Sequence, residues 1–195
     1  MKHLPNLLTI SRIVLTPVFL VLILMGHFWE QFIAVIIFIV ASISDWLDGK
    51  LARHYQVSSR LGKFLDPLAD KILVLSAFIV LPFVLRDPWI VPWWGVTIIV
   101  IRDVLITGLR MYTESQGRSV VTLSLAKTKT AFQLTFLILA LILLAASKSP
   151  WEPVIGEYAG QILYSPFMFA FMLVVVALTA YTGYQYIRFR PQTMA

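Results

Sequence analysis

The chain has 195 residues, of which 59% are hydrophobic and only 13% are charged. Soluble domains average about 45–50% apolar and about 25% charged residues, so this composition excludes a soluble globule and a disordered chain. Because cysteine is absent, a disulfide framework, a thiolate metal site and a cysteine nucleophile are excluded as well. The composition predicts a polytopic membrane protein with one domain over residues 1–195, in which a net charge of +6 needs an explanation.

Six segments are apolar over the length that a helix needs to cross a bilayer. A hydrocarbon core of about 30 Å requires ~20 apolar residues per helix. In chain order the segments are residues 6–27, 31–52, 66–86, 91–113, 124–147 and 163–187. The stretch 148–161 contains Pro150, Pro153 and Gly156 and is predicted to be an external loop. The predicted fold is therefore all-α, with six transmembrane helices.

The positive charges indicate how these helices are oriented. With six spans both termini lie on one side, and that side receives every Lys and Arg of the chain except Arg86 and Lys148. By the positive-inside rule, both termini are cytoplasmic. Tryptophans favour the opposite ends of the helices, as in an aromatic belt: Trp29, Trp89, Trp93, Trp94 and Trp151.

Carboxylates at the cytoplasmic ends of the second and third spans are the clearest indication of a functional site. Asp45 and Asp48 are three residues apart, Asp66 and Asp70 are four apart, and each pair shares one face of a helix. A carboxylate at membrane depth costs ~2.5–3.5 kcal/mol, which makes it a candidate functional group. The connection between the two spans is short, so we expect the two pairs to converge near the cytoplasmic surface.

Four clustered carboxylates need cations to neutralise them. Oxygen ligands without His or Cys favour hard cations such as Mg²⁺, Mn²⁺ or Ca²⁺, and a set of four suits two bridged ions that serve displacement at phosphorus. The alternative is a set of helix caps and interfacial salt bridges, with these partners: Arg53, Arg60, Lys63 and Lys71. Spacing alone does not decide which Asp would act as a base.

The fourth and fifth spans supply basic side chains near the same surface. Arg110 and Lys127 lie close to the cytoplasmic ends of these spans, Arg102 lies eight residues before Arg110, and Lys129 follows Lys127. Asp103 can pair with Arg102 or Arg110, whereas the two lysines have no acid within ten residues. This surplus predicts an acceptor that carries a phosphate, and the alternative is topological anchoring and attraction to anionic lipids.

Residues 45–70 contain a complete motif. Its eight fixed positions follow the spacing D-x2-D-G-x2-A-R-x8-G-x3-D-x3-D and are Asp45, Asp48, Gly49, Ala52, Arg53, Gly62, Asp66 and Asp70. This pattern resembles the signature of the CDP-alcohol phosphotransferase family. The opening residues 5–12 also resemble the family, and residues 101–110 and 117–130 resemble its branch that makes phosphatidylglycerophosphate. That branch more usually has Arg-Glu where this chain has Arg102-Asp103.

The resemblance implies a fold and a set of site residues. The family has six transmembrane helices, often as a homodimer, with a metal site facing the cytoplasm. By the motif, Asp45, Asp48 and Asp66 would hold two Mg²⁺ or Mn²⁺ ions, and Asp70 would lie near the second ion as general base. The pocket for the CDP-linked donor would be lined by Asn6, Thr9, Asp48, Gly49, Ala52, Arg53 and Gly62. The acceptor phosphate would meet the basic residues named above: Arg102, Arg110, Lys127 and Lys129.

The resemblance also implies the reaction. The family transfers a phosphoalcohol group from a CDP-linked donor to an alcohol and releases CMP, and the branch uses CDP-diacylglycerol and glycerol 3-phosphate. Other acceptors within the family are inositol phosphate, or phosphatidylglycerol as in cardiolipin synthases. Membrane prenyltransferases also use Asp pairs, but generally have longer chains. A cation-coupled transporter would carry polar groups at mid-membrane in several helices, whereas here they crowd one face. Expected partners are membrane lipids and a second copy of the chain, with no nucleic acid, in a bacterial inner membrane.

Overall fold

The computed structural model describes residues 4–55, 62–87, 89–116, 124–151 and 153–188. Side chains are described for residues 11–44, 71–87, 89–113, 115–116, 125–151 and 153–188. Within these residues the chain forms seven helices and no strand. They are α1 (Leu4–Met25), α2 (Phe28–Tyr55), α3 (Gly62–Leu85), α4 (Trp93–Ser115), α5 (Ser124–Ala146), α6 (Pro153–Leu163) and α7 (Pro166–Arg188). The all-α prediction is confirmed for the described part of the chain.

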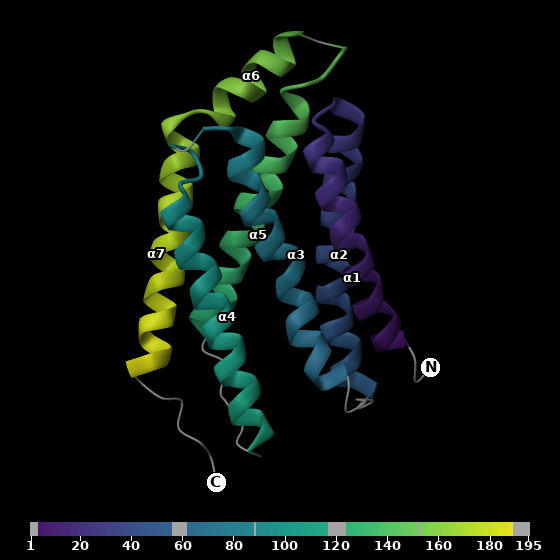
Figure 1. Cartoon of the computed structure of the whole chain (residues 1–195), viewed down its shortest axis with the longest axis vertical. Coiled ribbons are helices and arrows are strands. Elements are labelled where there is room, and N and C mark those ends of the chain that lie inside the picture. Colours follow the sequence, from purple (N-terminus) through teal and green to yellow (C-terminus); the bar gives the residue numbers. More distant parts are fainter. Residues whose placement is uncertain (1–3, 56–61, 88, 117–123, 152, 189–195) are drawn as a thin grey trace.

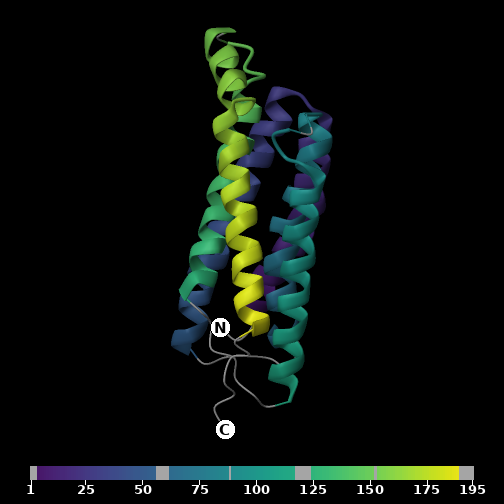
Figure 2. The same ribbon diagram turned by 90° about the vertical axis from the view of Figure 1, so that its left-hand side faces the viewer.

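Six of the helices form an elongated bundle, and the short α6 lies across one end of it (Figure 1). Successive long helices run in opposite directions. As a result, α1 begins, α2 ends, α3 begins, α4 ends, α5 begins and α7 ends at the end opposite α6 (Figures 1 and 2). We call this the carboxylate end, because Asp45, Asp48, Asp66 and Asp70 lie in the parts of α2 and α3 that reach it. The other is called the α6 end.

The six long helices occur where apolar segments predict them, whereas the loop predicted for residues 148–161 is correct for residues 148–151 and wrong from Pro153 onward. Residues Pro153–Leu163 form α6, which buries Ala159 and Leu163 and exposes most of its other side chains. Pro153 at the first helical position explains the start, since a missing N–H costs nothing there. Among the described residues, Leu125–Ala146 and Pro166–Arg188 are long and apolar enough to cross a membrane.

The core runs along the whole bundle. α1 packs against α2 and α3, α5 packs against α2, α3, α6 and α7, and α4 packs against α3 and α7. Aromatic pairs join several of these helices: the Phe19 and Phe38 ring centroids are 5.6 Å apart, and Phe78 stacks on Phe136 at 6.1 Å. Long apolar side chains also cover the outside, as on α2 at Ile36 and Val40. An apolar exterior of this kind suits a lipid environment.

The α6 end is joined by contacts between distant segments. The Lys148 ammonium donates a hydrogen bond to the Gly26 carbonyl at 2.8 Å, where Gly26 ends α1 with a φ of 82°. The Tyr164 hydroxyl donates to the Leu85 carbonyl at 3.3 Å. The rings of Trp29 and Trp151 meet edge to face, with centroids 5.2 Å apart. The tryptophans predicted for an outer belt are all exposed: Trp29, Trp89, Trp93, Trp94 and Trp151.

Candidate active site

The backbone brings the two Asp pairs to the same end of the bundle. Asp45 and Asp48 lie in the last turns of α2, and Asp66 and Asp70 lie in the first turns of α3. Both segments reach the carboxylate end (Figure 1). The side chains of the donor residues and motif lie outside the described residues: Asn6, Thr9, Asp45, Asp48, Gly49, Ala52, Arg53, Gly62, Asp66 and Asp70. Their ligand roles therefore stay predictions.

Two of the predicted acceptor cations lie at this same end. Arg110 is in the last turns of α4 and Lys127 is in the first turn of α5, and both side chains are exposed. Figure 2 shows the end of α4 and the start of α5 at the lower end of the bundle, with the end of α2 and the start of α3. The alternation of helix directions explains this grouping, because every second connection returns the chain to one end.

The other two predicted acceptor cations form a buried cluster with Asp103. The Lys129 ammonium donates to both carboxylate oxygens of Asp103, at 2.6 and 2.7 Å. The Arg102 guanidinium donates to the same carboxylate at 3.0 Å and to the Thr182 hydroxyl of α7 at 3.0 Å. Lys129 is 2% exposed and Asp103 is 1% exposed. The cluster joins α4, α5 and α7, and its charge-assisted bonds are of the strong kind.

Within this cluster, Lys129 and Arg102 both have Asp103 as a partner, whereas a phosphate was predicted as their ligand. The absence of a nearby acid in the sequence favoured a phosphate as the partner of Lys129, yet Asp103 reaches it from another helix, 26 positions away. The pairing of Asp103 with Arg102 is one of the two alternatives that the sequence allowed. Contact of either cation with an acceptor phosphate stays a prediction, and both already have a carboxylate partner.

A glycine on α7 makes room for the Arg102 side chain. A Cβ atom added at Gly183 would lie 2.9 Å from Arg102 Cγ, closer than real Cβ contacts. The missing side chain therefore lets the guanidinium reach Thr182, the residue before Gly183. Deeper in the same seam, the Gln133 amide donates to the Thr179 hydroxyl at 3.4 Å, so α5 and α7 share a second polar contact.

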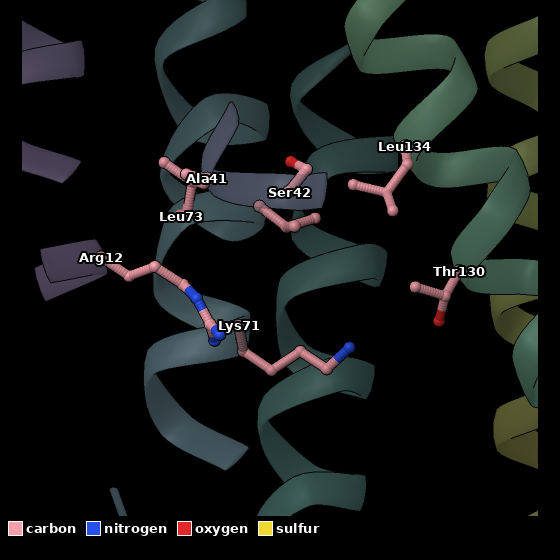
Figure 3. Close-up of a pocket in the computed structure, with 8 residues that line it drawn as sticks. Arg12, Ala41, Ser42, Lys71, Leu73, Thr130 and Leu134 are labelled. Atoms are coloured by element: carbon pink, nitrogen blue, oxygen red, sulfur yellow. The ribbon is translucent and has the colours of Figure 1, made fainter. Parts of the chain in front are cut away.

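A cavity of about 140 Å³ lies between α1, α2, α3 and α5. Its polar lining consists of Arg12 from α1, Ser42 from α2, Lys71 from α3 and Thr130 from α5. Figure 3 shows the Arg12 and Lys71 side chains extending into the space between these helices, with Thr130 on the α5 side. The apolar lining is Ala41, Leu73, Val74 and Leu134.

None of the polar cavity residues is among the predicted site residues. In the sequence, Arg12 belongs to the opening segment that resembles the family, Lys71 is an alternative partner for the carboxylates, and both count toward the predicted orientation. The signal that could have found them is a charged residue inside an otherwise apolar segment, which is costly in a membrane and marks function. Ser42 and Thr130 carry no such signal, because hydroxyl residues are common in membrane helices.

The sequence as a whole matches a known family. A sequence model of the CDP-alcohol phosphatidyltransferase family matches residues 2–182. The chain belongs to this family. A CDP-diacylglycerol–glycerol-3-phosphate 3-phosphatidyltransferase of Bacillus subtilis is 36% identical to it, covering 95% of this chain and 94% of the relative. The enzyme of the same name from Escherichia coli K12 is 34% identical, with 95% and 93% covered, and that of Salmonella paratyphi A is 34% identical with the same coverage.

Family membership raises the question of a divalent cation. Among the residues whose side chains are described, no group of three or more His, Cys, Asp or Glu residues could hold a metal ion, and the four motif carboxylates lie outside that set. Their chemistry does fit: four carboxylates at the same end of the bundle offer only oxygen ligands, which Mg²⁺ and Mn²⁺ prefer. The CDP-alcohol phosphatidyltransferase motif and the donor set therefore agree.

Proposed function

We propose that this chain transfers the phosphatidyl group of CDP-diacylglycerol to glycerol 3-phosphate, giving phosphatidylglycerophosphate and CMP in phospholipid biosynthesis. The observation that carries the proposal is the arrangement at the carboxylate end. The whole family motif in α2 and α3 lies at the same end as Arg110 and Lys127 in α4 and α5. The relatives that carry this activity in their names are matched over nearly their full length, which supports the same donor and acceptor.

The motif carboxylates are the proposed metal ligands. Asp45, Asp48, Asp66 and Asp70 would hold two divalent cations, Mg²⁺ or Mn²⁺, which neutralise charge on the donor diphosphate and on the departing CMP. Small residues next to the carboxylates let the nucleotide approach the helix backbone. The proposed donor pocket comprises Asn6, Thr9, Asp48, Gly49, Ala52, Arg53 and Gly62.

The chemical step is a displacement at phosphorus. Asp70 accepts the proton of the acceptor hydroxyl, and that oxygen forms a bond to the phosphorus attached to diacylglycerol. The bond between this phosphorus and the CMP oxygen breaks, so CMP leaves with the electron pair. Because the hydroxyl becomes far more acidic as its bond to phosphorus forms, a carboxylate of low pKa suffices as base.

The acceptor phosphate requires cations at the same end. Arg110 and Lys127 are exposed there, and a guanidinium fork with an ammonium is a common phosphate-binding combination. Lys129 and Arg102 were predicted for the same role and lie behind them, bonded to Asp103. We propose that Arg110 and Lys127 contact the phosphate directly. Lys129 and Arg102 would add positive potential from inside the bundle.

The membrane arrangement follows from the helices. We propose that α1 to α5 and α7 cross the bilayer of a bacterial inner membrane, with both termini and the carboxylate end in the cytoplasm. The positive charges at that end and the exposed tryptophans at the α6 end support this orientation. The diacyl tails of the donor would stay in the bilayer among membrane lipids, and the family resemblance supports a homodimer.

Purified protein incubated with CDP-diacylglycerol and a panel of acceptors tests the function. CMP release with glycerol 3-phosphate that depends on Mg²⁺ or Mn²⁺ is the expected result. Release with inositol phosphate or phosphatidylglycerol, but not with glycerol 3-phosphate, would replace the acceptor. Failure to release CMP with any acceptor at any metal concentration would contradict the enzyme and favour a transporter, which ion-flux measurements in vesicles would detect.

A further inference from the structure

The cavity between α1, α2, α3 and α5 has the composition of an anion site. Two cationic side chains line it, Arg12 and Lys71, and they come from different helices. Arg12 is only 6% exposed. A buried cation in a membrane protein is expensive unless anions accompany it, so charges retained at this depth point to a function.

Both cations keep enough donors for a ligand. Each also interacts with other groups of the chain. A guanidinium has five N–H donors and an ammonium has three, so a protein partner does not exhaust either of them. Each of the two side chains can therefore donate to an anion in addition to its protein partner.

The hydroxyl groups of the lining add directional contacts. Ser42 Oγ is buried and has no hydrogen-bond partner, which is costly for a hydroxyl unless a ligand or water completes it. Thr130 donates its hydroxyl proton to the Ala126 carbonyl at 3.1 Å, which leaves its oxygen able to accept. The remaining walls are aliphatic, and such walls strengthen the electrostatic contacts of a bound anion by excluding water.

The position of the cavity connects it with the proposed reaction. Ser42 precedes Asp45 by three residues on α2, and Lys71 follows Asp70 on α3. Both residues lie on the membrane side of the carboxylates, because α2 enters and α3 leaves the carboxylate end at these points (Figure 1). The cavity thus adjoins the motif, yet none of its lining residues belongs to it.

We propose that this cavity binds the phosphoryl group of a phosphate ester through Arg12, Lys71 and Ser42. Its volume of about 140 Å³ is far more than a single water molecule needs, so a phosphate group fits in it. The inference rests on the proposed function for the source of the ester. Either the acceptor or the phosphodiester of the lipid donor supplies this chemistry.

Binding without metal tests the site apart from catalysis. Purified protein in EDTA is titrated calorimetrically with inorganic phosphate and with glycerol 3-phosphate, and glycerol serves as the uncharged control. The wild type is expected to bind both anions and not glycerol. Arg12→Gln and Ser42→Leu, which remove a charge and fill the cavity, should each raise the Kd by about tenfold or more, because each removes a ligand contact. Arg12→Lys, which keeps the charge, should recover part of the affinity.

A matched control distinguishes an effect at the cavity from a general effect of replacing a threonine on α5. Thr130 and Thr135 both donate their hydroxyls to the carbonyl four residues earlier, but Thr135 is exposed and does not line the cavity. Thr130→Val should weaken anion binding, whereas Thr135→Val should leave it unchanged. Equal effects of the two substitutions would contradict a contact with the anion. Unfolding temperatures of all variants show whether each protein is folded.

Kinetics then identify the source of the phosphoryl group. If the acceptor occupies the cavity, Arg12→Gln raises KM for glycerol 3-phosphate and leaves KM for CDP-diacylglycerol unchanged, and the reverse pattern assigns the cavity to the donor. No metal-free binding of either anion by the wild type, or unchanged Kd values in folded Arg12→Gln and Ser42→Leu, would overturn the proposal. CMP release is measured separately, so a failure of the enzymatic function is recognised as such.

Discussion

Asp103 accepts hydrogen bonds from two cations in a part of the bundle where its own side chain is almost completely buried. Nothing in the sequence distance between Asp103 and Lys129 predicts this pairing, because it depends on how α4 and α5 pack against α7. The carboxylates of the motif could be found from sequence because their spacing on single helices carries the information. A cation whose partner lies on another helix has no such local signature.

The buried pair makes Lys129 a residue on which stability depends. Lys129→Met leaves the buried Asp103 carboxylate with Arg102 but without its closest partner, so the loss should approach, as an upper bound, the about 3–5 kcal/mol of a broken buried ion pair. Lys127→Met is the matched control, since Lys127 is exposed and lies two residues earlier on the same helix. Its stability should change by less than about 0.5 kcal/mol, as for most surface substitutions.

Unfolding of the purified variants in detergent, followed by circular dichroism, measures this difference. The double variant Asp103→Asn, Lys129→Met should recover part of the loss, because the neutral amide needs less charge compensation and its oxygen can still accept the hydrogen bond from Arg102. Equal stability of Lys129→Met and Lys127→Met would contradict a structural role for the pair.

Lys127 has a different expected role, at the acceptor. Lys127→Ala should raise KM for glycerol 3-phosphate by about tenfold, which corresponds to one lost charge-assisted hydrogen bond. The KM for CDP-diacylglycerol should change much less. Steady-state CMP release with each substrate varied in turn gives both constants. Equal increases in the two KM values would show that Lys127 is not a specific contact of the acceptor.

At the scale of helices, the six long helices can be predicted from the sequence, whereas the short α6 cannot. Hydropathy detects a helix whose apolar residues cover its whole circumference, as on α5 and α7. α6 escapes it because Pro153–Leu163 is short and buries only Ala159 and Leu163 against the end of the bundle. Pro and Gly residues then favour a loop, although Pro153 begins the helix and Gly156 lies inside it.

The contact between α4 and α7 depends on a glycine. In Gly183→Ala the new methyl group would meet Arg102 Cγ at 2.9 Å and push the guanidinium away from Thr182. Overpacking of this kind costs about 1–3 kcal/mol. Gly108→Ala on α4 is the matched control, since nothing lies within 4 Å of its added Cβ. There, the better helix propensity of alanine should stabilise the protein by up to about 1 kcal/mol.

Thermal unfolding of the two alanine variants distinguishes these effects. We expect the unfolding temperature to fall for Gly183→Ala and to stay equal or rise for Gly108→Ala. A Gly183→Ala variant as stable as the Gly108→Ala variant would show that Arg102 adjusts freely and that the close approach has no energetic consequence.

At the scale of the whole molecule, the two ends of the bundle carry different kinds of residues. The carboxylate end carries the family motif and the basic residues Arg110 and Lys127, and the α6 end carries the five exposed tryptophans named above and Lys148. This polarity could be predicted from sequence, because charge counts depend only on which connection a residue belongs to. The cavity lined by Arg12 and Lys71 could not, since it requires the relative positions of four helices.

The proposed orientation can be measured with single cysteines, because the natural chain contains none. Ser115→Cys places a thiol at the carboxylate end of α4, and Glu157→Cys places one on α6; both positions are exposed. A membrane-impermeant maleimide added to intact spheroplasts should label the variant at 157 at once. The variant at 115 should be labelled only after the membrane is permeabilised, and the opposite pattern would contradict cytoplasmic termini.

Incorporation of radiolabelled glycerol 3-phosphate into lipid by the purified protein measures the proposed reaction itself. With CDP-diacylglycerol and Mg²⁺ or Mn²⁺, the wild type should form a labelled lipid that migrates as phosphatidylglycerophosphate. Asp70→Asn should reduce this incorporation to background while Mn²⁺ binding is largely kept, because the base is lost and most ligands remain. Absence of labelled lipid with the wild type, or turnover of Asp70→Asn within about tenfold of wild type, would contradict the account, since loss of a general base costs about 10²–10⁴ in rate.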